Sequence, residues 1–289
     1  MSERVSSVVP AGFEIEFSDS AHRYWIDGDH AYSVSSVLKQ TVPVDLSDWA
    51  KRQAIAGMLA LRDEVRVRPV GVNDALNLFS EHGVGPDAHR DFAAARGTAV
   101  HDAFEKLGRD EELWIANYYE WEYVDKEGNV SFHDVRGYVR ALNKWWLKFS
   151  PEVIEQELMV GSKARGYAGR FDSLCIIDGE LWLIDLKTSK GVYESHHCQL
   201  GLYARALEES GYGMPDRMGV LHVNNDGEYV LHESPKELVL AAADDAFDWF
   251  LAKKQLEKKL NALQRGRERE RRENTRRAER INRYSRDVS

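Results

Sequence analysis

The chain has 289 residues, of which 43% are hydrophobic and 30% charged, so it can bury a substantial core as one large domain or as a core with an attached lobe, and disorder throughout is excluded. Two cysteines, Cys175 and Cys198, cannot form a framework of disulfides and neither has a C-x-x-C partner, which favours a reducing cytosol. A net charge of −9 argues against a protein built only to coat DNA.

Short elements are expected near the start of the chain. Residues 13–17 and 23–26 favour strands around a polar turn, and a helix is expected over 33–40. A second helix is expected over 46–63, with Ser47 near its first turn. The chain therefore opens with a small lobe of strands and helices.

The sequence shows no targeting or membrane segment. Residues 1–8 are polar and lack the apolar core of a signal peptide. No apolar run approaches the roughly 20 residues that span a bilayer. A soluble, intracellular protein without a membrane partner is expected.

A helix is predicted over 87–108, with His101 and Glu105 four residues apart on it. A lone histidine among apolar helix residues is most often an ordinary surface or core group, so this position by itself indicates no chemistry.

An aromatic-rich insertion, predicted to be helical, follows at about 109–150. Its aromatic side chains could stack on the bases of a single strand, although such residues more often fill a core between a lobe and a sheet. They are Trp114, Tyr118, Tyr119, Trp121, Tyr123, Trp145 and Trp146.

The most informative segment is a predicted hairpin. Residues 170–177 and 180–188 are rich in β-forming residues and are joined by Asp178-Gly179, a strong hairpin signal. Alternation along the second strand places Asp185 and Lys187 on one face. Both faces are apolar until the end of the strand, which indicates a central strand covered on both sides.

Asp172, Asp185 and Lys187 suit phosphodiester chemistry. Mg²⁺ prefers oxygen ligands and keeps several waters, so Asp172, Asp185 and the Leu186 carbonyl would hold it with positions left for phosphate and water. Lys187 would orient or deprotonate the attacking water and attract the phosphate. A D-x-K sequence on a strand also occurs by chance, Asp172 could cap a turn, and Lys187 could be an ordinary residue at a strand end.

Gln199 and Tyr203 lie four residues apart on the next predicted helix, where a core-facing tyrosine is the plain alternative to a functional one. A second hairpin is expected from 217–223 and 228–232, followed by a helix from Pro235. This order predicts an α/β fold, a mixed central sheet flanked by helices, within a single domain over 1–252.

The end of the chain has a different charge. Residues 253–289 contain 14 Lys or Arg against 6 Asp or Glu, a net charge of +8, which leaves 1–252 with a net charge of −17. Such a tail could contact phosphates or could be a solvated, charged helix or a disordered segment. The apolar stripe of Leu256, Leu260 and Leu263 is expected to pack, and packing to end at Gly266.

Three motifs, GRFD ending at Asp172, DLK from Asp185 to Lys187, and QLGLY from Gln199 to Tyr203, resemble those of the PD-(D/E)XK nucleases, specifically the RecB-like and phage exonuclease branch. The resemblance implies a restriction-endonuclease-like core. It also implies that His101, in RGTAVHDAFEKL, joins the metal shell and that Glu157, in EQELMV, assists it.

For function, the resemblance implies a Mg²⁺- or Mn²⁺-dependent exonuclease acting at DNA ends, with Gln199 and Tyr203 positioning the strand. The setting would be phage or bacterial recombination or repair in the cytoplasm, with a single-strand annealing recombinase as a possible partner. Some relatives, including the CRISPR-associated adaptation nucleases, hold an iron–sulfur cluster on four cysteines, so this chain is similar to the clusterless kind.

Three alternatives remain open. The chain could be a sequence- or structure-selective endonuclease, or an inactive nuclease fold that binds DNA, although an inactive copy would be free to lose Asp172, Asp185 or Lys187. An enzyme using Lys187 as an amine nucleophile is disfavoured, because two neighbouring carboxylates would keep the pKa of the lysine high.

Overall fold

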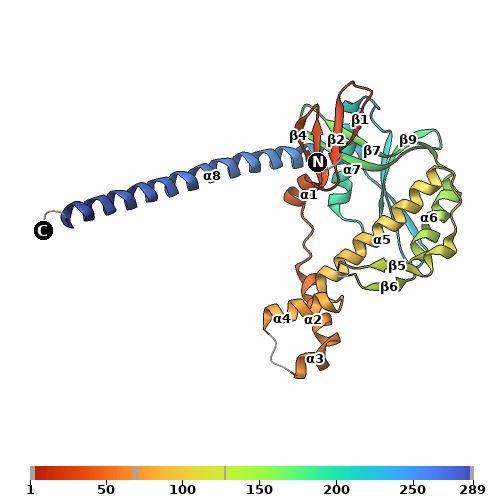
Figure 1. Ribbon diagram of the computed structural model, residues 1–289. Coiled ribbons are helices and arrows are strands. Elements are labelled where there is room, and N and C mark those ends of the chain that lie inside the picture. The colour runs from red at the N-terminus through yellow and green to blue at the C-terminus, as the bar shows by residue number, and fades with distance from the viewer. Residues whose placement is uncertain (1–3, 68–70, 127, 287–289) are drawn as a thin grey trace.

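A computed structural model describes residues 4–67, 71–126 and 128–286, and its centre is one large mixed sheet (Figure 1). Its strands run in the order β1-β2-β3-β4-β8-β9-β10-β11, with β7 paired to β8. They are β1 (Val5–Val8), β2 (Glu14–Ser18), β3 (Arg23–Ile26), β4 (Asp29–Ser33), β7 (Glu152–Ser162), β8 (Tyr167–Ile177), β9 (Glu180–Lys187), β10 (Arg217–Val223) and β11 (Tyr229–Glu233).

Helices lie on both faces of this sheet and in a lobe beside it (Figure 1). They are α1 (Val34–Thr41), α2 (Ser47–Ala60), α3 (Arg62–Val67), α4 (Val72–Glu81), α5 (Gly85–Gly108), the 3-10 turn η1 (Ile115–Tyr118), α6 (Arg136–Phe149), α7 (Glu194–Ser210) and α8 (Lys236–Arg286). The predicted fold class, a mixed sheet flanked by helices, is confirmed.

The hairpin of β8 and β9 forms where the sequence predicts it. Asp178 and Gly179 have φ of 53° and 81°, which are the positive values that a tight two-residue hairpin turn requires. β9 then pairs in parallel with β10, placing Asp185 opposite Val220, so antiparallel and parallel pairing meet at this strand. β9 is therefore a central strand, as predicted.

Alternation along β9 separates the core into two layers. Leu183 packs with α1, α7 and the first part of α8, whereas Trp182, Ile184 and Leu186 pack with α5 and α6. Because both faces are covered by apolar residues, polar side chains emerge only where β9 ends.

The segment 109–150 differs from the predicted helical insertion. It contains a short hairpin, β5 (Trp121–Val124) and β6 (Val130–His133), before α6. The side chains of β5 alternate between partly buried and exposed positions, a period of two that favours a strand over a helix. Trp145 of α6 is fully buried against the sheet, so this helix belongs to the main core.

Helix α8 has 51 residues and leaves the body of the protein as a projecting arm (Figure 1). Phe247 and Phe250 anchor its first part in the core. The prediction that the following leucines pack is wrong, because Leu256, Leu260 and Leu263 are 55%, 54% and 61% exposed where the helix has left the body. The end of the predicted tail, residues 287–289, lies outside the described residues. In the described part of the chain, no helix is long and apolar enough to cross a membrane.

Candidate active site

Five elements bring the predicted site residues together beside the end of β9. Asp172 lies on β8, Asp185 and Lys187 on β9, and Glu157 on β7. Antiparallel pairing of β7 with β8 joins Gln156 to Ser173 and Leu158 to Phe171, which sets Glu157 opposite Asp172. His101 comes from α5, and Gln199 and Tyr203 come from α7.

His101, Glu157 and Asp172 form the tightest cluster. Nδ1 of His101 lies 3.5 Å from Oδ1 of Asp172 and 3.8 Å from Oε1 of Glu157. One potential ligand atom from each residue lies within 4.8 Å of the other two. Burial lowers the pKa of His101, but the charge of Asp172 and the hydrogen bond to Glu157 outweigh it and raise the pKa to about 9.

Asp172 is held in place by the main chain of β9. The Leu186 N–H donates a hydrogen bond of 2.6 Å to its Oδ2, which leaves Oδ1 facing His101. The buried carboxylate thus connects β9 to the cluster and cannot rotate away without breaking a charge-assisted hydrogen bond.

Asp185 lies outside that cluster and faces Lys187. Its Oδ2 is 2.7 Å from Nζ of Lys187, and the residue is only 1% exposed. Burial raises the pKa of Asp185, whereas Lys187 opposes the rise. Burial lowers the pKa of Lys187, but the charges of Asp185 and Asp172 outweigh it, so the pKa is raised and the ammonium stays charged.

Neither carboxylate oxygen of Asp185 has a hydrogen-bond partner of good geometry among the described residues, despite the short distance to Lys187. A buried, charged acceptor without hydrogen bonds is costly unless a further cation completes its surroundings. The arrangement therefore suits a bound metal ion.

Gln199 and Tyr203 form a pair on α7. The Nε2 of Gln199 donates a hydrogen bond of 3.1 Å to the Tyr203 hydroxyl oxygen. Burial, and secondarily the charge of Asp185, raise the pKa of Tyr203 well above its ordinary value, so the phenol stays neutral.

A family model of the PD-(D/E)XK nuclease superfamily matches residues 75–283, which is more than half of the chain and includes every one of these residues. The chain belongs to the PD-(D/E)XK nuclease superfamily. A search of curated proteins found no match to the sequence.

Among solved structures, the chain is similar to an alkaline exonuclease from Laribacter hongkongensis, at 15% identity and a TM-score of 0.32, over 43% of this chain and 67% of that one. It is also similar to an exonuclease candidate from Eubacterium rectale, at 10% identity and a TM-score of 0.36, over 56% of this chain and 65% of that one. The chain spans 55% to 67% of the length of the solved structures it matches. These likenesses are too distant to carry an argument about activity.

Members of this superfamily use divalent metals, and the residues present fit such an ion. The cluster supplies carboxylate oxygens, which suit hard ions such as Mg²⁺ and Mn²⁺, and one imidazole nitrogen, a ligand more typical of other divalent metals. Asp185 adds a buried carboxylate that is paired with Lys187 and has no hydrogen-bond partner of good geometry among the described residues. The ligand cluster and the buried Asp185 are made of residues that are distant in the sequence and that only the fold brings together.

Sequence reasoning missed two supporting features of this nuclease site. A Cβ on Gly169 would lie 2.7 Å from the Tyr203 ring, so glycine lets α7 approach β8 closely. The only sequence signal was a glycine inside the strand that carries Asp172. Arg96 of α5 donates to the Thr188 carbonyl at 3.1 Å, which ties the His101 helix to the end of β9.

Glu157 has φ of 50°, a left-handed backbone conformation that costs a residue other than glycine about 1–3 kcal/mol. Strain of this kind gathers at functional sites, where it directs a side chain that regular strand geometry would direct elsewhere. In this protein the strained backbone conformation of Glu157 is found together with the placement of its carboxylate beside His101.

The raised pKa of His101 predicts a pH-dependent stability. A histidine whose pKa rises from 6.5 to about 9 on folding stabilises the metal-free protein fully below about pH 6.5, and this contribution is lost as pH rises through 9. We expect wild type to lose about 1–3 kcal/mol of unfolding free energy over this interval relative to His101→Gln. Urea unfolding in EDTA at both ends of the interval measures it.

His89, exposed on the same helix, is the matched control, and His89→Gln should keep the wild-type pH dependence. If the unfolding free energies of wild type and His101→Gln changed equally with pH, His101 would not gain a proton on folding.

Proposed function

We propose that the chain is a metal-dependent DNA exonuclease of the RecB-like branch, which hydrolyses phosphodiester bonds at DNA ends. The observation that carries the proposal is the convergence of His101, Glu157 and Asp172 beside the buried Asp185–Lys187 pair in a PD-(D/E)XK nuclease. The GRFD, DLK and QLGLY motifs and the histidine-bearing helix favour the exonuclease branch.

In this proposal His101, Asp172, Asp185 and the Leu186 carbonyl hold Mg²⁺ or Mn²⁺, and Glu157 supports them. The ion supplies Lewis-acid stabilisation of charge on the scissile phosphate and lowers the pKa of water. One potential ligand atom of Glu157 lies within 4.8 Å of those of His101 and Asp172, close enough for Glu157 to bind the same ion directly or through water.

Lys187, held as an ammonium beside Asp185, donates a hydrogen bond that orients the attacking water and attracts the scissile phosphate. Gln199 and Tyr203 position the strand, with the neutral phenol as a hydrogen-bond donor. The biological setting that fits is phage or bacterial recombination or repair in the cytoplasm, with a single-strand annealing recombinase receiving the product.

Digestion of end-labelled linear DNA and closed circular DNA, with and without Mg²⁺ or Mn²⁺, tests the proposal. Loss of linear DNA alone, dependent on metal and abolished by Asp185→Ala, is the expected result. Cutting of circles would replace it with an endonuclease. Binding of DNA by an inert wild type would replace it with an inactive nuclease fold.

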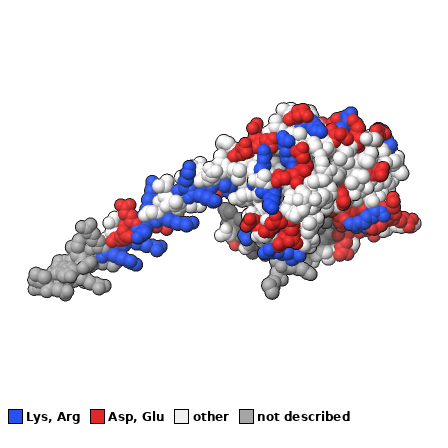
Figure 2. Space-filling view, turned by 90° about the horizontal axis from the view of Figure 1, so that it is seen from above, with Lys and Arg blue, Asp and Glu red and all other residues white. Residues whose placement is uncertain are grey.

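The arm formed by α8 is expected to contact the DNA backbone. Figure 2 shows Lys and Arg along its described part, with acidic groups among them. Arg265, Arg269, Arg272 and Arg276 recur every three or four residues, so they lie along one face of the helix, and all are exposed. This stripe can follow phosphates outside the active site.

Changing these four arginines to Gln should reduce the slope of log affinity against log salt concentration. The slope should fall in magnitude by up to about 3–4, since each phosphate contact contributes about 0.9 to it. The variant with four lysines keeps the charge and is the matched control. Fluorescence anisotropy with duplex DNA in EDTA, over a range of salt concentrations, measures both slopes. Equal salt-dependence slopes for the Gln and Lys variants would show that these four side chains do not contact the DNA phosphates.

A further inference from the structure

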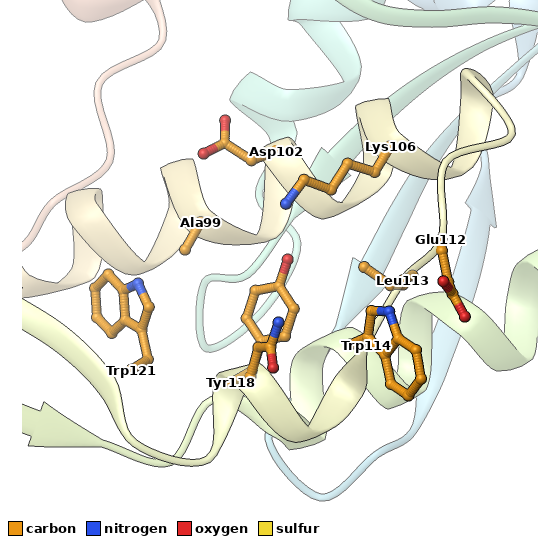
Figure 3. A pocket seen from close by; sticks show the side chains of 9 residues that line it. Ala99, Asp102, Lys106, Glu112, Leu113, Trp114, Tyr118 and Trp121 are labelled. Atoms are coloured by element: carbon orange, nitrogen blue, oxygen red, sulfur yellow. The ribbon is translucent and has the colours of Figure 1, made fainter.

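A pocket lies on the side of α5 that faces the segment 112–121 (Figure 3). It has a volume of about 250 Å³. Ala99, Asp102 and Lys106 of α5 line one side, and aromatic and polar residues of the following segment line the other. None of its lining residues belongs to the candidate active site.

Aromatic rings form one wall of the pocket. Trp114, Tyr118 and Trp121 rise from the segment beneath α5, with Tyr118 between the two indoles (Figure 3). Tyr118 is only 9% exposed, whereas Trp114 is 60% exposed and has no ring or cation partner among the described residues. Such an exposed indole at the mouth of a cavity offers a flat face for stacking.

The polar side chains of the pocket are unpaired. The side chains of Asp102, Lys106, Glu112 and Asn117 make no hydrogen bond or ion pair with another residue in the described ranges, although Asp102 and Lys106 lie four apart on α5. Lys106 instead extends over Tyr118 (Figure 3). The pocket thus presents free donors and acceptors beside a stacking surface.

The charges indicate the class of ligand. Two carboxylates beside one ammonium repel a phosphate overall. A neutral ring with donors and acceptors on its edge can form hydrogen bonds with both the carboxylates and the ammonium. Nucleobases have this chemistry, and proteins read unstacked bases by aromatic stacking and hydrogen bonds to their edges.

The pocket is close to the candidate active site along the chain. Asp102 directly follows His101, so the two side chains leave α5 about 100° apart around its axis. A helix with its side chains is about 10–12 Å across, so a strand held at His101 can place a nearby base on the adjoining face of α5.

We propose that this pocket binds one unpaired nucleobase of the DNA strand engaged at the active site, stacked on Trp114. The inference rests on the proposed function, since it assumes a DNA substrate. The Glu112 carboxylate beside Trp114 accepts hydrogen bonds, so a base with an exocyclic amino group is preferred to thymine, which lacks one.

The test uses the full chain in EDTA, where DNA is bound but not hydrolysed, and hairpin duplexes with one open end. A single abasic site is moved through the first nucleotides of either strand. In wild type, one abasic position should weaken binding by about 5- to 150-fold, the loss of one stacked base. Trp114→Ala should weaken binding of intact DNA similarly and show no further loss at that position.

Tyr119→Ala is the matched control, because Tyr119 is a 52% exposed aromatic that does not line the pocket. Trp114→Phe should keep the discrimination, since it keeps a ring. Uniform effects of abasic sites in wild type, or an unchanged pattern in Trp114→Ala, would overturn the inference.

Hydrolysis in Mg²⁺ separates this inference from the proposed function. If wild type digests DNA but no abasic position matters for binding, the base pocket fails and the nuclease proposal stands. If wild type digests no DNA, the nuclease proposal fails, and the abasic scan in EDTA still decides the pocket.

Discussion

Lys187→Ala is expected to slow hydrolysis of linear DNA by about 10²–10³-fold, the usual loss when one donor that stabilises developing charge is removed. The ammonium of Lys187 lies 2.7 Å from the buried Asp185 and is held charged by it. Single-turnover digestion at saturating Mg²⁺ measures the rate of the chemical step.

Lys187→Arg is expected to be nearly as slow as Lys187→Ala. A planar guanidinium cannot occupy the position of a compact ammonium beside Asp185, and it presents its donors in a fixed fork rather than as a point charge. Lys190→Ala, at an exposed position three residues later, is the control and should keep the wild-type rate. An active Lys187→Arg variant would reduce the role of Lys187 to electrostatic attraction.

Asp172→Asn is expected to have a comparable effect for a different reason. The amide oxygen can still accept the hydrogen bond from the Leu186 N–H, so the fold of β8 and β9 is preserved. The lost charge lies 3.5 Å from His101, so the pKa of His101 should fall from about 9 toward 6.5. Activity should fall by more than the ~10–100-fold typical of residues that only support a metal ligand.

An NMR titration of the histidine ring in metal-free protein measures the pKa change, and digestion of linear DNA measures activity. Asp178→Asn, in the hairpin turn of the same strand, is the control, because asparagine tolerates its positive φ. A His101 pKa unchanged in Asp172→Asn would show that the two residues do not interact in solution.

Much of the fold could be predicted from short-range patterns. The turn at Asp178-Gly179 and the alternation along β9 are readable because turn chemistry and side-chain direction act over a few residues. The predicted helix over 33–40 is similarly local, since Ser33 caps it by accepting from the Ser36 N–H. The hairpin of β5 and β6 was missed because its aromatics were interpreted as helix residues.

The arm shows where such patterns fail. An apolar stripe of Leu256, Leu260 and Leu263 is typical of a packed helix, yet these residues are exposed. Periodicity states which side chains share a face of a helix. It does not state whether another element covers that face.

The sequence by itself determined the central hairpin, the helix capped by Ser33, and the presence of Asp172, Asp185 and Lys187 on adjoining strands. Only the tertiary structure decided that Glu157 joins His101 and Asp172 while Asp185 faces Lys187, and that α5 shares a pocket with Trp114. The reason is physical. Local patterns depend on backbone geometry over a few residues, whereas contacts between distant residues depend on strand register, strain such as that at Glu157, and packing of the whole core.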